Sequence, residues 1–574
     1  MTPESRGTRW KSLSLSNFTR EIGTSIKSWK GCIKFTLSLL LVVILLVSLY
    51  HVYKPEKTPS YFTVVVDCGS TGSRVNIYKW VKNGTTYEAH PILLQTFPEQ
   101  LHKGRDQDDA CQYHCMQTEP GLDMFVHNTS GVREAIEPLI RWAEQQIPRE
   151  RHEDTSLFVL GTAGLRKLEA ADVDWILGTV ETVAKNHSFI CRRNWIRVLS
   201  GQEEAYYGWV ALNYKMGRLR NSDEEPTFGV LDMGGSSLQV VVEDDTVRDS
   251  NHIVRSKIGS VKHNILAYSL KEFGLNVAFD RSVVMLSEET PLTVNNNGMY
   301  QLGHPCLSSR VSRNYTCVGC FHLNATDLGR KLNSKLSKNH SSSLNLVGDP
   351  DWERCMGLAR AAAIRTSSTD LIQVIMDLGC RTQLPSSDST ELQNETVVPR
   401  KIARFHALSG FFAVYNVLKL NSKANLTTIL MRGQELCSHL WSNTFKFPGN
   451  RKYVDQFCFN VPYLTSLIRD ALCMGDTELI FGPGDVSWTL GAALVEGKSL
   501  RRSETIVQND SSRTENKVVS SPVLFIILFS CLSFTIYLVQ VTWNALRATS
   551  LPARKAPAVG VSLPSFISPK RQSN

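Results

Sequence analysis

Two segments of the chain repeat the same order of residue types, and this repeat restricts the fold more than any other feature. Residues Val64–Ser73 and Gly229–Leu238 each combine a hydrophobic run, an aspartate (Asp67 or Asp232) and a turn rich in Gly and Ser. A second strand-like run follows each turn. One such copy is typical of an ordinary Asp-Gly hairpin turn. Two copies predict two equivalent β-hairpins in a fold with two similar halves.

The residue types in the two turns are those that bind phosphate groups. Glycine lets backbone N–H groups approach an anion closely, hydroxyl groups add donors, and an aspartate at a strand end can hold a hydrated cation. Two such hairpins facing each other would hold a polyphosphate from both sides. Other nucleotide and hydrolase motifs are absent from the sequence, because G-x-x-x-x-G-K-[ST], H-E-x-x-H and G-x-S-x-G do not occur.

Two segments between the hairpins add polar groups. Leu160–Arg166 ends a predicted strand and places Thr162 between glycines. Leu199–Trp209 begins a predicted helix with Glu203 and Glu204 in its first turn. Acids at that position usually complement the helix macrodipole. Beside a bound polyphosphate, one of the two carboxylates could instead be the base that deprotonates an attacking water.

Strand, helix and Gly-rich turn signals alternate from Tyr61 to Tyr214, which predicts an α/β fold. We expect strands over Tyr61–Val66 and Leu157–Leu160 and an amphipathic helix over Gly131–Ile147. Residues 287–348 are rich in Ser, Asn and Lys and contain cysteines, which predicts a loop-rich, glycosylated insertion.

Two long apolar segments, residues 32–52 and 523–543, predict membrane-spanning helices. A cleaved signal peptide is the alternative for the first, but no small-residue cleavage site follows its apolar run. Basic residues outnumber acidic ones in the flanking tails, residues 1–31 and 544–574, which predicts that both tails are cytoplasmic. The body between the spans, which ends in a polar stalk at residues 499–522, is then lumenal or extracellular.

Two further signals agree with a body in the secretory pathway. Asn-x-Ser/Thr acceptors occur in the body at Asn83, Asn128, Asn186, Asn314, Asn324, Asn339, Asn394, Asn425 and Asn509. Twelve of the 14 cysteines lie outside the predicted spans, in a compartment where disulfides persist. Cys317 and Cys320 could form half a zinc site or a redox pair, but disulfide bonding is favoured because no second pair stands at zinc-finger spacing.

The net charge of +9 by itself suggests a nucleic-acid partner. The two tails, counted through Lys34 on the N-terminal side, together carry +10 and leave the body at −1. The basic residues therefore indicate membrane topology, and we expect no nucleic-acid partner.

Five ordered segments make the chain resemble the nucleoside triphosphate diphosphohydrolases, or apyrases, and among them the two-span, plant-type members. The segments are DCGSTGSR (Asp67–Arg74), GTAGLR (Gly161–Arg166), SGQEEAYYGW (Ser200–Trp209), LDMGGSSLQV (Leu231–Val240) and AYSLKEFG (Ala267–Gly274). The resemblance covers about Tyr61 to Gly497. It implies two RNase H-like domains of the actin/Hsp70/sugar-kinase superfamily around a cleft, with domain I at 58–197 plus 479–498 and domain II at 198–478.

The resemblance also implies an enzyme that hydrolyses nucleoside tri- and/or diphosphates to the monophosphate and orthophosphate with Ca²⁺ or Mg²⁺. In the family pattern Glu204 is the base that activates water, and Asp67 and Asp232 hold the metal through its water shell. Thr162, Ser237 and Gln239 place the metal and the attacking water. The remaining matched residues bind phosphate or support its loops: Ser70, Thr71, Gly72, Ser73, Arg74, Arg166, Gly234 and Gly235.

Base recognition rests on weaker matches. The family stacks the nucleotide base between aromatic rings, and the matching segments suggest Phe412 and Tyr463, although both are equally compatible with plain core packing. The chain departs from the family pattern at four positions of the motifs, namely Cys68, Ala205, Ser236 and Leu238. None of these departures removes a proposed chemical group, so activity is expected while rate and substrate range stay open.

Two alternatives keep the fold and change the function. One is a nucleotide- or glycan-binding receptor with a degenerate site, and the other is a kinase or chaperone-type ATPase of the same superfamily. In the Golgi lumen an apyrase would hydrolyse the UDP or GDP left by glycosyltransferases, whereas at the cell surface it would clear extracellular ATP and ADP. The short first span favours a thinner secretory-pathway membrane. Homo-oligomer formation through the spans stays open.

Overall fold

The computed structural model describes residues 61–82, 92–98, 116–219, 226–246, 250–258, 261–289, 293–294, 300–315, 344–364, 369–378, 404–442, 451–475 and 477–497, with scattered positions at 40–43 and 534–544. The chain divides into two compact units, Met1–Ser499 and Leu500–Asn574. The sheets and helices below belong to the first unit.

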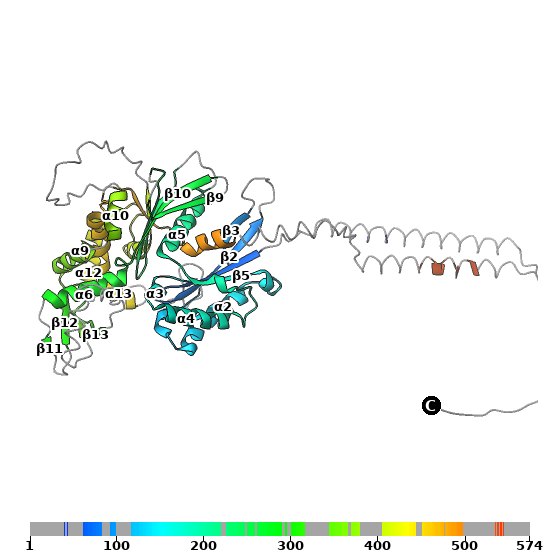
Figure 1. Ribbon diagram of the computed structural model, residues 1–574, viewed down its shortest axis with the longest axis horizontal. Helices are drawn as coiled ribbons and strands as arrows, with labels where there is room; N and C mark the ends of the chain where they lie inside the picture. Colours follow the sequence, from blue (N-terminus) through cyan, green and yellow to red (C-terminus); the bar gives the residue numbers. More distant parts are fainter. Residues whose placement is uncertain are drawn as a thin grey trace, which may run out of the picture. The chain divides into compact units, whose positions relative to one another are not determined.

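The first sheet is built around the first predicted hairpin (Figure 1). Its strands are β1 Tyr61–Cys68, β2 Ser73–Lys82, β3 Ile92–Phe97, β4 Met116–Thr118, β5 Ser156–Gly161 and β6 Ile196–Val198. They stand in the order β3-β2-β1-β5-β6, with β4 paired to β2. Neighbours among β1, β2 and β3 are antiparallel, whereas β5 and β6 run parallel to β1. The strands expected at Tyr61–Val66 and Leu157–Leu160 are therefore confirmed as β1 and β5.

The second sheet repeats this plan around the second hairpin. Its strands are β7 Gly229–Met233, β8 Leu238–Glu243, β9 Ile253–Ile258, β10 Val261–Leu270, β15 Phe405–Ser409 and β16 Leu479–Phe481, in the order β16-β15-β7-β8-β10-β9. β7, β8 and β10 form an antiparallel series, and β15 and β16 run parallel to β7. The α/β prediction is confirmed, and the two sheets share one strand plan, with β9 as an added edge strand of the second.

Helices cover the first sheet. They are η1 Leu122–Phe125, α2 Thr129–Gln146, η2 Arg149–Asp154, α3 Ala163–Arg166, α4 Ala170–Ala184 and η3 Arg193–Trp195. α2 confirms the helix expected at Gly131–Ile147 and begins earlier, because the Asn128 side chain accepts a hydrogen bond from the backbone N–H of Gly131 at 3.0 Å. Its apolar residues Val132 and Ile136 are fully buried in the core beneath β1. Helical periodicity therefore buries the face that the sequence indicates.

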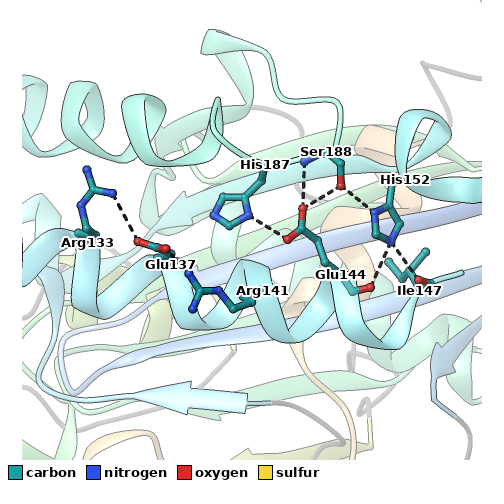
Figure 2. Close-up of polar contacts among 8 residues, drawn as sticks. All are labelled: Arg133, Glu137, Arg141, Glu144, Ile147, His152, His187 and Ser188. Atoms are coloured by element: carbon teal, nitrogen blue, oxygen red, sulfur yellow. Dashed lines mark hydrogen bonds and ion pairs between the residues drawn. The ribbon is translucent and has the colours of Figure 1, made fainter. Parts of the chain in front are cut away.

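A polar network joins the end of α2 to the loop after α4 (Figure 2). The Glu144 carboxylate accepts hydrogen bonds from the backbone N–H and hydroxyl of Ser188 at 2.9 and 2.8 Å, and it lies 3.0 Å from Nδ1 of His187. His152 Nδ1 contacts the same Ser188 hydroxyl at 2.7 Å. Burial alone would raise the pKa of Glu144, but these hydrogen bonds hold it below its ordinary value. The network therefore fixes α2 and α4 against each other.

The second sheet carries the remaining helices. They are α5 Gly201–Lys215, α6 Leu275–Glu289, α9 Trp352–Ile364, α10 Thr369–Asp377, α11 Gly410–Val417, α12 Leu426–Trp441, α13 Arg451–Ser466 and the π-helical turn η4 Leu467–Ala471. α5 packs against β7, β8 and β10. Residues 488–497 form a further helix, which contacts the first sheet where the Thr489 hydroxyl lies 2.7 Å from the Tyr78 hydroxyl.

The segment at 287–348, where the sequence predicts a loop-rich insertion, contains strands among the residues that the structure describes. They form the third sheet, β11 Thr293–Val294, β12 Tyr300–His304, β13 Ser312–Tyr315 and β14 Leu344–Gly348, in the order β11-β12-β14-β13. Leu302, Leu344 and Leu346 are buried. Few apolar residues among many polar ones suffice here because these side chains pack against the core that surrounds the second sheet. Residues 316–343 lie outside the described residues.

Cysteines of the body form disulfides, as expected for a secretory compartment. Cys306 pairs with Cys355, which ties the third sheet to α9, and Cys437 pairs with Cys458, which ties α12 to α13. Cys68 and Cys191 are free thiols among the described residues. Cys317 and Cys320 lie outside the described residues.

The predicted spans at 32–52 and 523–543 fall almost wholly outside the described residues, as do the tails and the stalk. Within the part of the chain that is described, no helix has both the length and the apolar character needed to cross a membrane. The spans and the domain boundaries stay predictions.

Candidate active site

The two hairpins have the same register and the same turn. Asp67 stands opposite Arg74 between β1 and β2, and Asp232 stands opposite Gln239 between β7 and β8. In the first turn the Gly69 N–H donates to the Gly72 carbonyl at 3.0 Å, and in the second the Gly234 N–H donates to the Ser237 carbonyl at 2.9 Å. The repeat in the sequence is therefore a repeat of backbone geometry.

The two turns face each other closely. A Cβ atom placed on Gly235 would lie 3.2 Å from Cγ2 of Thr71 and 3.4 Å from Oγ of Ser70. Ser70, Thr71, Gly234 and Gly235 are all half-buried and therefore partly open to solvent. The missing side chain at Gly235 is what allows the approach. This is the arrangement in which backbone N–H groups and hydroxyls from both turns can reach one anion.

Three carboxylates gather beside the turns. Burial raises the pKa of Asp67 from its ordinary 3.8 to about 7; the Arg74 guanidinium opposes this shift, while the charges of Glu204 and Asp232 add to it. Burial likewise raises the pKa of Glu204, against the attraction of Arg166 and with the repulsion of Asp232. Burial is the main cause of both raised pKa values, and the neighbouring like charges add to it. Such a cluster of buried carboxylates is costly unless a cation joins them.

The donor set fits a hydrated divalent cation. Oδ1 of Asp67 is buried without a hydrogen-bond partner, and the Arg74 guanidinium stands 3.8 Å from Oδ2. Among the described residues, no group of three or more His, Cys, Asp or Glu side chains is placed to ligate a metal directly. Aspartate oxygens at the ends of two strands suit Ca²⁺ or Mg²⁺, because both cations prefer oxygen ligands.

The two glutamates of α5 have different environments. Glu203 completes a capping box: its N–H donates to the Ser200 hydroxyl at 3.1 Å, and its carboxylate accepts the Ser200 N–H at 2.8 Å. Glu204 instead accepts a hydrogen bond from Arg166 Nη2 at 2.8 Å, and its side chain is only 12% exposed. Helix capping therefore accounts for Glu203, whereas Glu204 is the carboxylate beside the aspartates.

The other predicted polar residues lie around the turns. The Thr162 N–H donates to the Cys68 carbonyl at 3.1 Å, which places this residue under the first turn. Gln239 Nε2 donates to the Ser237 hydroxyl at 2.8 Å. Ser73 is fully buried, so its hydroxyl lies in the interior and away from the solvent-facing side of the turn. Gly72 is also buried, packed against the Thr118 carbonyl.

The two predicted base-stacking residues have different environments in the structure. Phe412 is half-buried, and its ring packs against Gly482 and Gly484. Tyr463 is fully buried, its hydroxyl donates to the Phe273 carbonyl at 2.9 Å, and its ring stacks on Phe459. A ring enclosed on both sides has no face for a base, so Tyr463 is placed in the core. Phe412 stays a prediction.

One residue near the site, Ser409, was not expected from the sequence. It follows Leu408, the residue of β15 that pairs with Asp232. Its φ of 52° and ψ of −114° are strained for a residue with a side chain. Burial raises the pKa of Asp232, and a hydrogen bond from the Ser409 side chain opposes that shift. The only signal in the sequence was its position, because β15 repeats β5 beside the second hairpin.

At Gly274 we expect a single added methyl group to have a large effect on activity. A Cβ atom there would lie 2.5 Å from the Gly235 carbonyl and would collide with the backbone of Ser236 and Ser237. We expect Gly274→Ala to displace the second turn and lower phosphate release at least about tenfold, because a 1 Å displacement can cost 10²-fold. Gly178→Ala in α4 is the control, since a Cβ there meets nothing within 4 Å. Equal activities of the two variants would contradict the close approach.

The raised pKa of Asp67 predicts how the metal-free chain responds to pH. The folded chain binds the Asp67 proton more tightly than the unfolded chain, so this group stabilises the fold below about pH 4 and loses that contribution as pH rises to about 7. With chelator present, the midpoint of thermal unfolding should fall across this window more steeply in the parent than in Asp67→Asn. Parallel curves for the two chains would show that Asp67 titrates normally.

Comparison with known proteins identifies the family. The chain belongs to the GDA1/CD39 (nucleoside phosphatase) family, whose model matches residues 53–509. "Probable apyrase 7" of Arabidopsis thaliana is 38% identical over 466 residues, which are 80% of this chain and 60% of the relative. "Ectonucleoside triphosphate diphosphohydrolase 1" of Mus musculus is 23% identical over 76% of this chain and 79% of the relative. The resemblance to the apyrases is confirmed.

The chain spans about 60% of the length of the Arabidopsis relative. Among solved structures, nucleoside triphosphate hydrolases from Neospora caninum align with 80% of this chain and 96% of their own, at 13% identity and a TM-score of 0.47.

Proposed function

We propose that the chain is a membrane-anchored apyrase that hydrolyses nucleoside tri- and/or diphosphates to nucleoside monophosphate and phosphate. The observation that carries the proposal is the pair of equivalent hairpins that face each other, with Glu204, Asp67 and Asp232 gathered beside them. Relatives named apyrase and ectonucleoside triphosphate diphosphohydrolase support the same chemistry.

The residues suggest an in-line hydrolysis. Backbone N–H groups of the two turns, with the Ser70 and Thr71 hydroxyls, hold the phosphate oxygens. Glu204 takes a proton from water, the water oxygen bonds to the terminal phosphorus, and the bond from that phosphorus to the bridging oxygen breaks. Orthophosphate leaves, and the nucleotide keeps one phosphate fewer. Thr162, Ser237 and Gln239 would place the metal and the attacking water, and Arg74 supports the first turn.

Asp67 and Asp232 would hold Ca²⁺ or Mg²⁺ through its water shell. When bound, the cation neutralises charge on the phosphoryl oxygens. Arg166 holds Glu204 through the 2.8 Å contact, which keeps the base in one orientation before substrate arrives. The two similar sheets are proposed to be RNase H-like domains, with Phe412 at the nucleotide base.

The location is proposed from the sequence. Spans at 32–52 and 523–543 with cytoplasmic tails would leave the body in the lumen or outside the cell, and we favour the Golgi or another secretory membrane over the plasma membrane. The four described acceptor asparagines, Asn128, Asn186, Asn314 and Asn425, are all exposed, which supports a glycosylated, lumenal body. Two disulfides support the same compartment.

A substrate panel tests the function. The full-length chain is incubated with ATP, ADP, UDP, GDP and CDP in Ca²⁺, Mg²⁺ or chelator, and released phosphate is measured. We expect release from at least one diphosphate and its loss with chelator. Nucleotide binding without phosphate release from any substrate would favour a degenerate receptor. Phosphate release that is unchanged by chelator would contradict the requirement for a metal.

A further inference from the structure

A second polar cluster lies on the side of α5 that carries Glu203. Arg197, in the middle of β6, donates from Nη1 to the Glu203 carboxylate at 2.8 Å. Its Nη2 donates to Glu496 at 3.2 Å and to the Tyr207 hydroxyl at 3.3 Å. Tyr207 in turn donates its hydroxyl to the same Glu496 oxygen at 2.5 Å. One guanidinium thus joins β6, the first two turns of α5 and the helix at 488–497.

This cluster lies in the same helical turn of α5 as Glu204, the proposed catalytic base. Glu204 follows Glu203 in the same helical turn, so any rotation or shift of that turn moves the Glu204 carboxylate too. Gly491, in the helix at 488–497, packs directly against the backbone carbonyl of Tyr207, one turn further along α5. The remaining buried face of α5 packs against the second sheet. Arg197 and Glu496 therefore tie the second-sheet helix that carries the base to elements of the first sheet.

The charges are arranged to hold α5 without adding much stability. The side chains of Arg197, Glu203 and Glu496 are 32%, 40% and 30% exposed, and ion pairs that contact solvent stabilise a fold only modestly. Burial raises the pKa of Tyr207, and the acceptor Glu496 raises it further, so the hydroxyl keeps the proton that it donates. A fork-shaped donor between two carboxylates fixes direction as well as distance.

We propose that Arg197 is a positioning residue for catalysis, which holds the first turn of α5 so that Glu204 meets the attacking water, and that Glu496 fixes Arg197. This inference rests on the proposed function, because it gives Glu203 and Glu204 separate tasks in one reaction. Arg197 itself contacts neither the hairpin turns nor Glu204 through any described hydrogen bond or ion pair. Its effect must therefore act through the placement of α5.

The test compares variants of the full-length chain. Arg197→Met should lower kcat about tenfold with KM nearly unchanged, because a small displacement of a catalytic group costs rate rather than binding. Glu496→Ala should lower kcat less, and the double variant should resemble Arg197→Met alone. Arg197→Lys keeps the charge but lacks the fork, so its kcat should lie in between. Arg193→Met removes a nearby arginine that pairs with Glu181 and is the matched control.

Two readouts separate this inference from the proposed function. Hydrogen exchange of the amides at 204–208 should quicken in Arg197→Met and stay parental in Arg193→Met, and this holds whether or not a substrate is known. A parent that releases no phosphate would overturn the proposed function alone. Parental exchange and parental kcat in Arg197→Met would overturn the positioning role. A loss of kcat that is explained by unfolding of the variant, with an unfolding midpoint that falls to the assay temperature, would also overturn it.

Discussion

Glu204→Gln should bind nucleotide as the parent does and release phosphate roughly 10²–10⁴-fold more slowly, which is the usual worth of a positioned base. Glutamine keeps the size of the side chain and can still accept a hydrogen bond from Arg166, but it cannot take a proton from water. The measurement is single-turnover phosphate release together with nucleotide binding at equilibrium. Binding should be retained because the role that we propose for Glu204 is a contact with the attacking water rather than with the nucleotide.

Glu203→Gln is the matched control, since it is the neighbouring carboxylate in the same helical turn. Glutamine also serves at this position of a capping box, so the helix should keep its start. We expect its turnover to fall far less than that of Glu204→Gln. A Glu204→Gln chain with parental turnover, or a Glu203→Gln chain that is equally slow, would show that the base has been assigned to the wrong residue.

Asp232→Ala should raise the half-saturating concentration of Ca²⁺ or Mg²⁺ about 10–100-fold, the range seen when an outer-shell partner of a metal is removed. The reason is that Asp232 has no cation opposite it: its cross-strand partner is Gln239, whereas Asp67 faces Arg74. We infer that a bound metal would supply the positive charge that Arg74 supplies beside Asp67. Phosphate release measured against metal concentration checks this.

Asp245→Ala is the control for Asp232, because Asp245 is exposed just beyond the far end of the same β8 strand. Its metal dependence should match that of the parent. If Asp232→Ala also kept the parental dependence, the cation would have to be held elsewhere and the role of the second hairpin would need revision.

The hairpins could be predicted from the sequence because their signal is local. Asp67, the glycines of its turn and the flanking strand residues lie within ten positions, and backbone geometry follows from such short-range patterns. That the two copies face each other needs long-range packing, which the repeat suggested but did not fix. The contact of Gly235 with Thr71 supplies this part.

Other parts of the site could not be predicted from the sequence. The ion pairs of the two adjacent glutamates, Glu203 with Arg197 and Glu204 with Arg166, join different elements of the fold and leave no local signal in the sequence. The sequence left core packing of Tyr463 open, because an aromatic residue in the core and one in a binding site have the same local pattern, and the structure buries its ring. Ser409 was missed because its strained backbone depends on where β15 meets β7.

The third sheet was missed for a related reason. Its strands are short, and polar residues outnumber apolar ones in the segment at 287–348. Its stability comes from packing against the core of the second sheet and from the Cys306–Cys355 disulfide, which joins residues 49 positions apart. The amino-acid composition of a short segment shows neither its packing against a distant core nor its disulfide partner.

Hydrolysis of ADP in ¹⁸O-labelled water tests the central claim most directly, because the position of the label reports which phosphorus the water attacks. We predict one ¹⁸O atom in each released orthophosphate and none in AMP, with both products absent when metal is chelated. Label in AMP would place the attack on the inner phosphorus and contradict the in-line displacement at the terminal phosphate.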